Sequence, residues 1–221
     1  MSDNQRTVSG NVSDVAFTET VKAIQSRKGS RTAYARMEQG DGWQATITED
    51  LKQQIESQIS VFLATANAQG QPYIQHRGGP PGFMRAVDET TIAFADFAGN
   101  RQFITQGNLS DNPKAHLFLI DYAHQRRIKI WGTARVVEGD AALMAQRMPQ
   151  GYRARPEQVI LFTVTAWDVN CPQHIPRRFE AADVQAELDK RKRRIADLEA
   201  ELSRFRSASG QGPHLNAEAL T

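Results

Sequence analysis

The segment from Arg127 to Val136 constrains the fold more than any other part of the chain. Its apolar residues occupy every second position: Ile128, Ile130, Gly132, Ala134 and Val136. Successive side chains of a strand point to opposite faces, so this alternation predicts a strand with one face in a core. Arg127, Lys129 and Trp131 share the other face, where two cations and an aromatic ring suit a flat, anionic ligand. The alternative for this face is ordinary solvation.

Five further segments have the composition of strands: residues 60–66, 71–79, 91–96, 115–122 and 159–167. Most are joined by short turns rich in glycine, asparagine or aspartate, and few helices are available as crossovers. Segment 115–122 is almost entirely apolar, so we expect it to be buried on both faces. Six or so strands connected in this way predict a mainly β (α+β) protein, built on a small antiparallel barrel with flanking helices.

Two helices are expected before the barrel. Apolar spacing predicts the first over residues 14–27, with Gly29 as its stop. Thr48 is expected to cap the second, which would turn its apolar side chains inward. Those apolar side chains are Leu51, Ile55 and Ile59. Shorter helices are expected at 100–106 and 139–148.

Residues 181–206 contain no glycine or proline and consist mainly of Ala, Glu, Leu, Lys and Arg. Their apolar positions follow a heptad-like spacing interrupted by Arg191, which predicts a long helix that could dock against a partner subunit. The expected organisation has four parts: an N-terminal helical segment packing on the barrel (1–59), the barrel (60–180), the C-terminal helix (181–206) and a disordered tail (207–221).

Charge and cysteine content narrow the partners and the compartment. A net charge of +2 is too small a bias to indicate nucleic acid, and the basic run 190–194 is flanked by acids, as on a solvated helix face. The single cysteine, Cys171, allows no internal disulfide. No apolar run approaches the roughly 18–20 residues that span a bilayer, and the first residues lack a secretory signal. We therefore expect a cytoplasmic protein with neither nucleic acid nor a membrane as partner.

Two glycine-containing segments are candidates for binding a phosphate. Asn100, Arg101 and Gln102 follow Gly99 in a turn that opens a short helix, where an arginine beside free backbone N–H groups suits an anion. The alternative is a surface loop with an N-capping asparagine. In the segment from Gln75 to Gly79, Gln75 and Arg77 share one strand face and could meet a planar ring and a phosphate. The alternative here is a bulged strand end.

The loop after the last strand contains His174, Arg177 and Arg178 between two prolines. Cys171 and His174 have the spacing of half a metal site, but nothing else supplies a second pair of ligands, so no metal is predicted. No serine lies in the setting of a nucleophile elbow, so no Ser-His-Asp triad is predicted either.

Taken together and in order, these motifs resemble the pyridoxamine 5'-phosphate oxidase-like family of flavin-binding split barrels. The motifs are residues 72–82, residues 94–102, Asn112-Pro113 with the apolar strand after it, and residues 126–136. The ending 170–176 is similar to an oxidoreductase branch of that family. The similarity covers about residues 60–178.

The resemblance implies a homodimer that binds two FMN molecules in clefts between the subunits. It implies that the strand with His76 and Arg77 contacts the flavin and phosphate. The turn with Asn100 and Arg101 would contact the phosphate, and a C-terminal loop would cap the site from the partner chain. Arg127 would lie near the ring. The expected cofactor-binding residues are Gln75, His76, Arg77, Gly78, Asp96, Asn100, Arg101, Gln102, Arg127, Lys129, His174 and Arg177.

Three departures bear on the substrate. Asn100-Arg101-Gln102 stands where pyridoxamine phosphate oxidases proper have Ser-Arg-Lys, the segment 78–81 lacks their lysine, and their C-terminal Arg-x-His is not reproduced. We therefore do not expect vitamin B6 phosphate as the substrate. The hypothesis is an FMN-dependent oxidoreductase that moves hydride between NAD(P)H or a small organic substrate and an acceptor. The alternative is a non-enzymatic protein or sensor that binds flavin, haem or deazaflavin.

Overall fold

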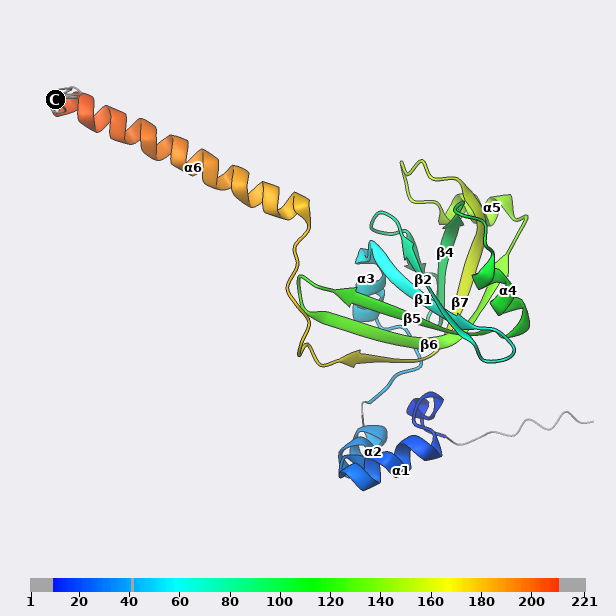
Figure 1. Ribbon diagram of the computed structural model, residues 1–221. Coiled ribbons are helices and arrows are strands. Elements are labelled where there is room, and N and C mark those ends of the chain that lie inside the picture. The colour runs from blue at the N-terminus through cyan, green and yellow to red at the C-terminus, as the bar shows by residue number, and fades with distance from the viewer. Residues whose placement is uncertain (1–9, 41, 211–221) are drawn as a thin grey trace, which may run out of the picture. The chain divides into compact units, whose positions relative to one another are not determined.

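The structure, a computed structural model, describes residues 10–40 and 42–210 and divides the chain into two compact units. The first unit ends at Ile175 and contains the sheet, and the second begins at Pro176 and contains one long helix. Figure 1 shows the strands of the first unit curving around a common interior, with short helices on the outside. This is the expected fold class, an antiparallel split β-barrel with flanking helices and a long C-terminal helix.

The sheet has seven strands in the order β2-β1-β5-β6-β7-β4-β3, and every neighbouring pair is antiparallel. Their bounds are β1 Ser60–Ala66, β2 Pro72–Gly78, β3 Met84–Ala86, β4 Thr91–Phe97, β5 Lys114–Asp121, β6 Arg126–Val137 and β7 Pro156–Asn170. The prediction from the sequence lacked β3, because three residues are too few to produce an alternation. It also placed the last strand at 159–167, within the longer β7.

The alternation along β6 has the predicted consequence. Ile128, Ile130 and Ala134 are buried in the barrel core, whereas Lys129 and Trp131 lie on the outer face. At Gly132 the pairing with β7 shifts register, and a Cβ there would lie 2.0 Å from the carbonyl oxygen of Thr163. Only glycine allows this close approach of two backbones, which bends β6 as the barrel closes.

β5 departs from the prediction. One face of the strand is buried through Ala115, Leu117 and Leu119, but the side chains between them are only half-buried. Both faces were expected to be in a core, because a nearly continuous apolar run does not show which side chains meet water. The outer face of β5 instead continues the outer face of β6.

The N-terminal part contains a 3-10 turn and three helices: η1 Val12–Val15, α1 Glu19–Lys28, α2 Arg31–Gln39 and α3 Glu49–Ser57. The single helix expected over 14–27 is wrong at its start, because the Thr18 hydroxyl accepts a bond from the Val21 N–H (3.3 Å) and begins α1 there. Its stop is correct, since Gly29 adopts a left-handed φ of 80°. α2 was not predicted.

α3 is capped by Thr48 as expected, with the hydroxyl accepting from the Leu51 N–H at 3.2 Å. Leu51 and Ile55 are fully buried. Ile59 is exposed, contrary to the prediction, because α3 ends at Ser57 and the chain turns into β1 before a further helical turn could carry this side chain inward.

Two short helices follow in the first unit. α4 spans Ile104–Asp111 and α5 spans Ala141–Arg147, the latter capped by the Asp140 carboxylate accepting from the Leu143 N–H at 2.8 Å. α4 begins four residues later than expected, because the chain from Gly99 to Phe103 forms an irregular turn instead of a first helical turn.

In the second unit, α6 spans Ala181–Ala208, and every residue of it is exposed. The helix therefore includes the first two residues of the tail expected at 207–221, and residues 211–221 lie outside the described part of the chain. None of the described helices is long and apolar enough to cross a bilayer.

Candidate functional site

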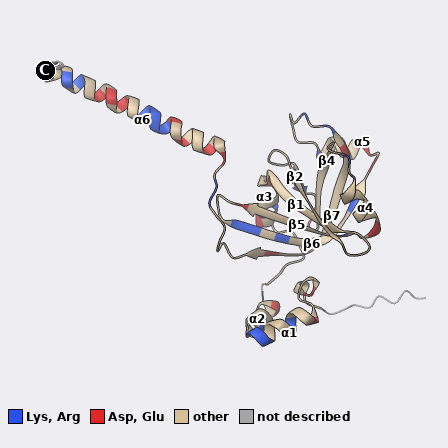
Figure 2. Ribbon diagram, in the orientation of Figure 1, with Lys and Arg blue, Asp and Glu red and all other residues tan. Residues whose placement is uncertain are grey.

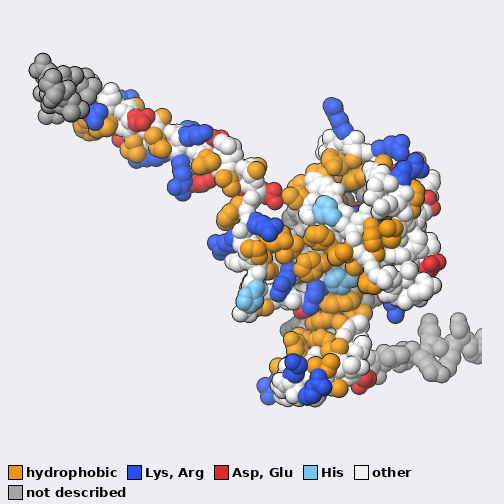
Figure 3. Space-filling model, viewed as in Figure 1, with side chains coloured by type: hydrophobic (Ala, Val, Ile, Leu, Met, Phe, Trp, Pro, Cys, Tyr) orange, Lys and Arg blue, Asp and Glu red, His pale blue; other side chains and the backbone are white. Residues whose placement is uncertain are grey.

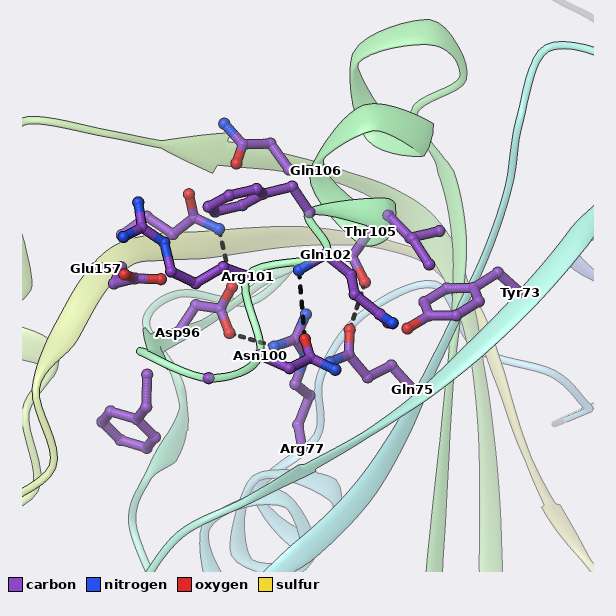
Figure 4. A pocket seen from close by; sticks show the side chains of 15 residues that line it. Tyr73, Gln75, Arg77, Asp96, Asn100, Arg101, Gln102, Thr105, Gln106 and Glu157 are labelled. Carbon is purple, nitrogen blue, oxygen red and sulfur yellow. Dashed lines mark hydrogen bonds and ion pairs between the residues drawn. The ribbon is translucent and has the colours of Figure 1, made fainter.

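A polar pocket lies in the first unit between β2 and the turn that joins β4 to α4 (Figure 4). Residues from β2, β4, α4, β7 and the turn between β4 and α4 surround it. They are Tyr73, Gln75, Arg77, Asp96, Phe97, Gly99, Asn100, Arg101, Gln102, Phe103, Ile104, Thr105, Gln106, Glu157 and Gln158. Six of the residues predicted to bind a cofactor therefore line one cavity: Gln75, Arg77, Asp96, Asn100, Arg101 and Gln102.

Alternation along β2 selects which of its residues reach the pocket. Gln75 pairs with Leu63 and Arg77 with Val61, and both partners are buried in the core. Gln75 and Arg77 therefore lie on the inner face of β2. His76, between them, points to the outer face.

An ion pair between Arg77 and Asp96 joins the two sides of the pocket. β2 and β4 are separated in the sheet order by four strands, so these two residues meet only because the sheet curls into a barrel. Gln158 Nε2 donates to the second carboxylate oxygen of Asp96 at 2.8 Å. The side chains of Arg77 and Asp96 are only 13% and 10% exposed, and Arg77 Nε is buried without a hydrogen-bond partner among the described residues. The guanidinium is thus held in place with an N–H still available to an acceptor.

The turn from Gly99 to Phe103 has a strained backbone. Arg101 and Phe103 both adopt the left-handed region, with φ of 59° and 54°, and neither is a glycine. Such residues cost on the order of 1–3 kcal/mol each and occur where the surroundings require them, often at binding sites. Asn100 Oδ1 accepts from the Gln102 N–H at 3.3 Å and stabilises the turn locally. The Arg101 guanidinium lies 5.6 Å from the centroid of the Phe103 ring.

α4 directs its N-terminus to the pocket. The residue before it, Phe103, has no side chain that could accept from the first N–H groups of the helix. Thr105 donates from its hydroxyl to Gln75 Oε1 at 2.9 Å, and Asn108 Nδ2 donates to Thr65 Oγ1 at 3.0 Å. These two bonds connect α4 to β2 and β1, so they hold the uncapped N–H groups of the helix in a fixed position relative to the pocket.

The combination suits one phosphate group. Two guanidinium groups and a helix N-terminus are the donors that bind phosphate in proteins. The cavity itself measures about 50 Å³, whereas sites that enclose a whole small molecule are typically about 300–1,000 Å³. The pocket of one chain can therefore take a phosphate, and a larger ring system would extend out of it.

The remaining predicted residues lie elsewhere in the fold. His76 is on the outer face of β2, where its Nε2 lies 2.9 Å from the Ser60 hydroxyl. Gly78 ends β2, and a Cβ there would lie 2.9 Å from the His76 ring, so a larger residue would require this side chain to move. Within one chain, neither residue joins the pocket.

Arg127 and Lys129 lie on the outer face of β6. Lys129 pairs with Asp168 at 3.2 Å, and its ammonium lies 5.3 Å from the centroid of the Trp43 ring and 5.2 Å from that of Trp131. Arg127 Nε is buried and has no hydrogen-bond partner in the described part of the chain. These cations do not converge with Arg77 and Arg101 within a single chain.

The outer face of β5 and β6 also carries a histidine with an altered pKa. The ring of His116 packs edge-on against Trp131, with 4.8 Å between centroids. Burial, with a smaller contribution from the Lys129 charge, lowers the pKa of His116 from 6.5 to about 4. The imidazole is therefore neutral at physiological pH.

The predicted loop residues are divided between the two units. His174 is exposed, has a left-handed φ of 66° and belongs to the first unit, whereas Arg177 belongs to the second. The loop is attached at Ile175, whose carbonyl accepts from Gln125 Nε2 at 2.7 Å. No group of three His, Cys, Asp or Glu side chains placed to hold a metal occurs in residues 10–40 and 42–210.

Sequence reasoning missed three kinds of pocket residue. Tyr73 shares the inner face of β2 with Gln75 and Arg77, so the alternation that identified those two could have found it. Thr105 could be identified as a pocket residue only once the true start of α4 was known. Gln158 faces the pocket because it pairs with Asp96 across β4 and β7, and no local signal reveals that register.

Comparison with known proteins places the chain in context. Residues 47–171 match the family described as Pyridoxamine 5'-phosphate oxidase. Among curated proteins, nothing matches this chain.

Solved structures that are similar include HupZ from Group A Streptococcus, with 25% identity over 60% of this chain and 99% of that one and a TM-score of 0.46. An FMN-binding protein from Syntrophomonas wolfei has 9% identity over 69% and 97%, with a TM-score of 0.44. A Clostridium acetobutylicum protein of the pyridoxinephosphate oxidase family has 17% identity over 59% and 92%, with a TM-score of 0.41.

Proposed function

Because this chain belongs to the pyridoxamine 5'-phosphate oxidase family, we propose that it binds FMN and that the pocket between β2 and the β4–α4 turn holds the FMN phosphate. The observation that carries the proposal is that Arg77, Arg101 and the uncapped N-terminus of α4 all line one small cavity. A dianionic phosphate bound there would receive charge-assisted hydrogen bonds, which are about twice as strong as neutral ones.

Each pocket residue has a distinct part in this proposal. Arg77 donates to the phosphate and is oriented by Asp96, which is itself held by Gln158. Arg101 supplies the second guanidinium from the strained turn. Thr105 and Gln75 keep α4 and β2 together through their hydrogen bond. A buried, unpartnered Arg77 Nε supports a ligand acceptor at this point.

The flavin ring would lie outside the small cavity, and we propose that a second copy of the chain covers it. His76, Arg127 and Lys129 are on the opposite face of the sheet from Arg77, so they would contribute to the site of the other copy and not to their own. The unpartnered Nε of Arg127 supports a role in contacting such a ligand. His174 and Arg177 are proposed to cap the ring from the partner.

The proposed activity is FMN-dependent oxidoreduction, with hydride moving between NAD(P)H or a small organic substrate and an acceptor. When bound, the isoalloxazine ring supplies the redox chemistry. The protein contributes by binding the phosphate, positioning the ring and excluding water. The departures from pyridoxamine phosphate oxidases at residues 78–81 and 100–102 support a substrate other than vitamin B6 phosphate.

A non-enzymatic flavin carrier or sensor is the second candidate. None of the described pocket residues is a histidine, lysine or cysteine, and both pocket carboxylates are paired, Asp96 with Arg77 and Glu157 with Arg155 at 3.2 Å. Tyr73 is then the remaining pocket side chain with a proton to exchange. Steady-state consumption of NAD(P)H above the background of free FMN distinguishes the enzyme from the carrier.

The test of cofactor identity is a visible spectrum of the purified protein, with mass spectrometry of the small molecule released on denaturation. The proposal expects FMN, and it expects FMN to bind more tightly than riboflavin, which lacks the phosphate. Haem or deazaflavin in the released fraction, or equal affinity for FMN and riboflavin, would overturn it.

A further inference from the structure

We propose that α6 forms a parallel, in-register coiled coil with α6 of a second copy of this chain. Two independent features of the helix support this proposal. One is an apolar stripe with the period of a coiled coil, and the other is a pattern of charges beside the stripe that is complementary to itself.

The apolar stripe runs the length of α6. The helix has 28 residues, or four heptads, and its large apolar side chains fall alternately three and four residues apart, except where Arg191 takes the place of one. Assigned to the inward-facing positions of a heptad, the a positions are Ala181, Leu188, Ile195 and Leu202, and the d positions are Val184, Arg191, Leu198 and Phe205. Three or four such heptads are enough to predict a coiled coil.

This stripe faces solvent within the described chain. Leu188 is 47% exposed, Ile195 54% and Phe205 70%, and no residue of α6 is buried. Figure 3 shows apolar side chains at intervals along the helix, and Figure 2 shows both signs of charge interspersed among them. A helix of this length with exposed leucines at a and d positions gains most by pairing with a matching stripe.

The flanking charges favour a second copy as the occupant. In a parallel pair, each g residue faces the e residue of the other helix five positions later. Glu187 then faces Lys192 of the second copy, Arg194 faces Glu199, and Glu201 faces Arg206. Every charged g residue therefore meets the opposite charge, and symmetry doubles each pair.

An antiparallel pair over the same stripe is less complementary. It brings g residues opposite g residues and e residues opposite e residues, so Arg194 still faces Glu201 and Lys192 still faces Glu199, but Glu187 faces Ala208 and Arg206 faces Gln185. Fewer charges then find a partner, which favours the parallel direction.

Arg191 interrupts the stripe at a d position. Its Nε lies 3.1 Å from Glu187 Oε1 of the same helix, so the guanidinium is already turned toward the edge of the stripe. The aliphatic stem can cover the seam while the charged end remains in water. A single polar residue at such a position lowers the stability of a coiled coil and restricts its register.

The test uses symmetric disulfide formation in the full chain, with the native cysteine removed by Cys171→Ser. We expect Leu188→Cys to give a covalent dimer on mild oxidation, because position 188 meets itself in a parallel pair. Ala186→Cys, on the outward side of the same turn, is the matched control and is expected to remain monomeric on a non-reducing gel. In an antiparallel pair the two 188 positions would be about 25 Å apart, from a rise of about 1.5 Å per residue.

Two further measurements decide direction and charge pairing. A mixture of Leu188→Cys and Phe205→Cys chains would form the mixed dimer only if the helices were antiparallel. Glu187→Lys with Glu201→Lys is expected to reduce Leu188→Cys cross-linking several-fold, and adding Lys192→Glu with Arg206→Glu should restore it. Preferential formation of the mixed dimer would overturn the proposal. So would the absence of a cross-link at Leu188→Cys beyond that of Ala186→Cys, because another molecule or none then covers the stripe. FMN content, measured on the same samples, is expected to stay constant.

Discussion

Replacing Arg101 by alanine tests the proposed phosphate site most directly. Arg101 contacts the Phe103 ring and makes no ion pair with a described carboxylate, so its removal leaves the internal bonds of the fold in place. Its left-handed φ is equally unfavourable for alanine and arginine, so the turn has no reason to change. The substitution should therefore reduce ligand binding without reducing stability.

The expected magnitude follows from the kind of contact that is lost. A hydrogen bond to a charged group contributes about 1.5–3 kcal/mol, which corresponds to a loss in FMN affinity of about 10- to 140-fold. Arg101 is exposed, so we expect the lower end of this range and a smaller effect at high salt. Riboflavin has no phosphate, and its affinity should not change.

The assay is fluorescence titration of the apoprotein with FMN and with riboflavin, for the original chain, for Arg101→Ala and for the control Arg135→Ala. Arg135 is an exposed arginine of β6 outside the pocket. Equal losses for both ligands would show that Arg101 acts on the fold or the ring, and an unchanged FMN affinity would show that it does not contact the phosphate. Either result would refute the reasoning.

Three further predictions concern stability. Gly132→Ala should lower the free energy of unfolding by at least about 1–3 kcal/mol, the range for overpacking, because its Cβ would lie 2.0 Å from the Thr163 carbonyl oxygen. The measurement is thermal unfolding. The control is Gly107→Ala in α4, which has open space around it and should not destabilise the protein. Leu51→Ala should cost about 2–5 kcal/mol in chemical denaturation, since Leu51 is fully buried; a cost below 1 kcal/mol would contradict its place in the core. Protonation of His116 should lower the free energy of unfolding as pH falls from about 6.5 to about 4, because the unfolded chain takes up a proton at this residue at a higher pH than the folded chain does. The loss should be at most about 3 kcal/mol and absent in His116→Asn, so an identical pH dependence in the two proteins would exclude the histidine as its source.

Local patterns in the sequence were sufficient for six of the seven strands and for the faces of β2 and β6. The alternation along β6 correctly identified Ile128 and Ile130 as core residues, and the same rule placed Gln75 and Arg77 on one face of β2. Capping rules were equally local, and Thr48 and Gly29 act as expected. These features depend on residues a few positions apart, so the chain reveals them without knowledge of the fold.

The irregular parts defeated the same reasoning. The start of α4 was placed four residues too early, because the left-handed conformations of Arg101 and Phe103 are stabilised by surroundings that a propensity does not include. Likewise the outer face of β5 was expected to be buried, since an apolar side chain at a half-exposed position has no separate signature in the sequence.

The sequence by itself determined which side chains share a face of β2 and of β6, because that depends only on the period of an extended backbone. Only the tertiary structure decided which faces meet. Arg77 and Asp96 belong to strands with four others between them in the sheet, and they form an ion pair because the sheet closes on itself. Arg127 and Lys129 carry the same charge as Arg77 but lie on the other side of the sheet. That separation follows from register and curvature, which arise from contacts between residues far apart in the chain.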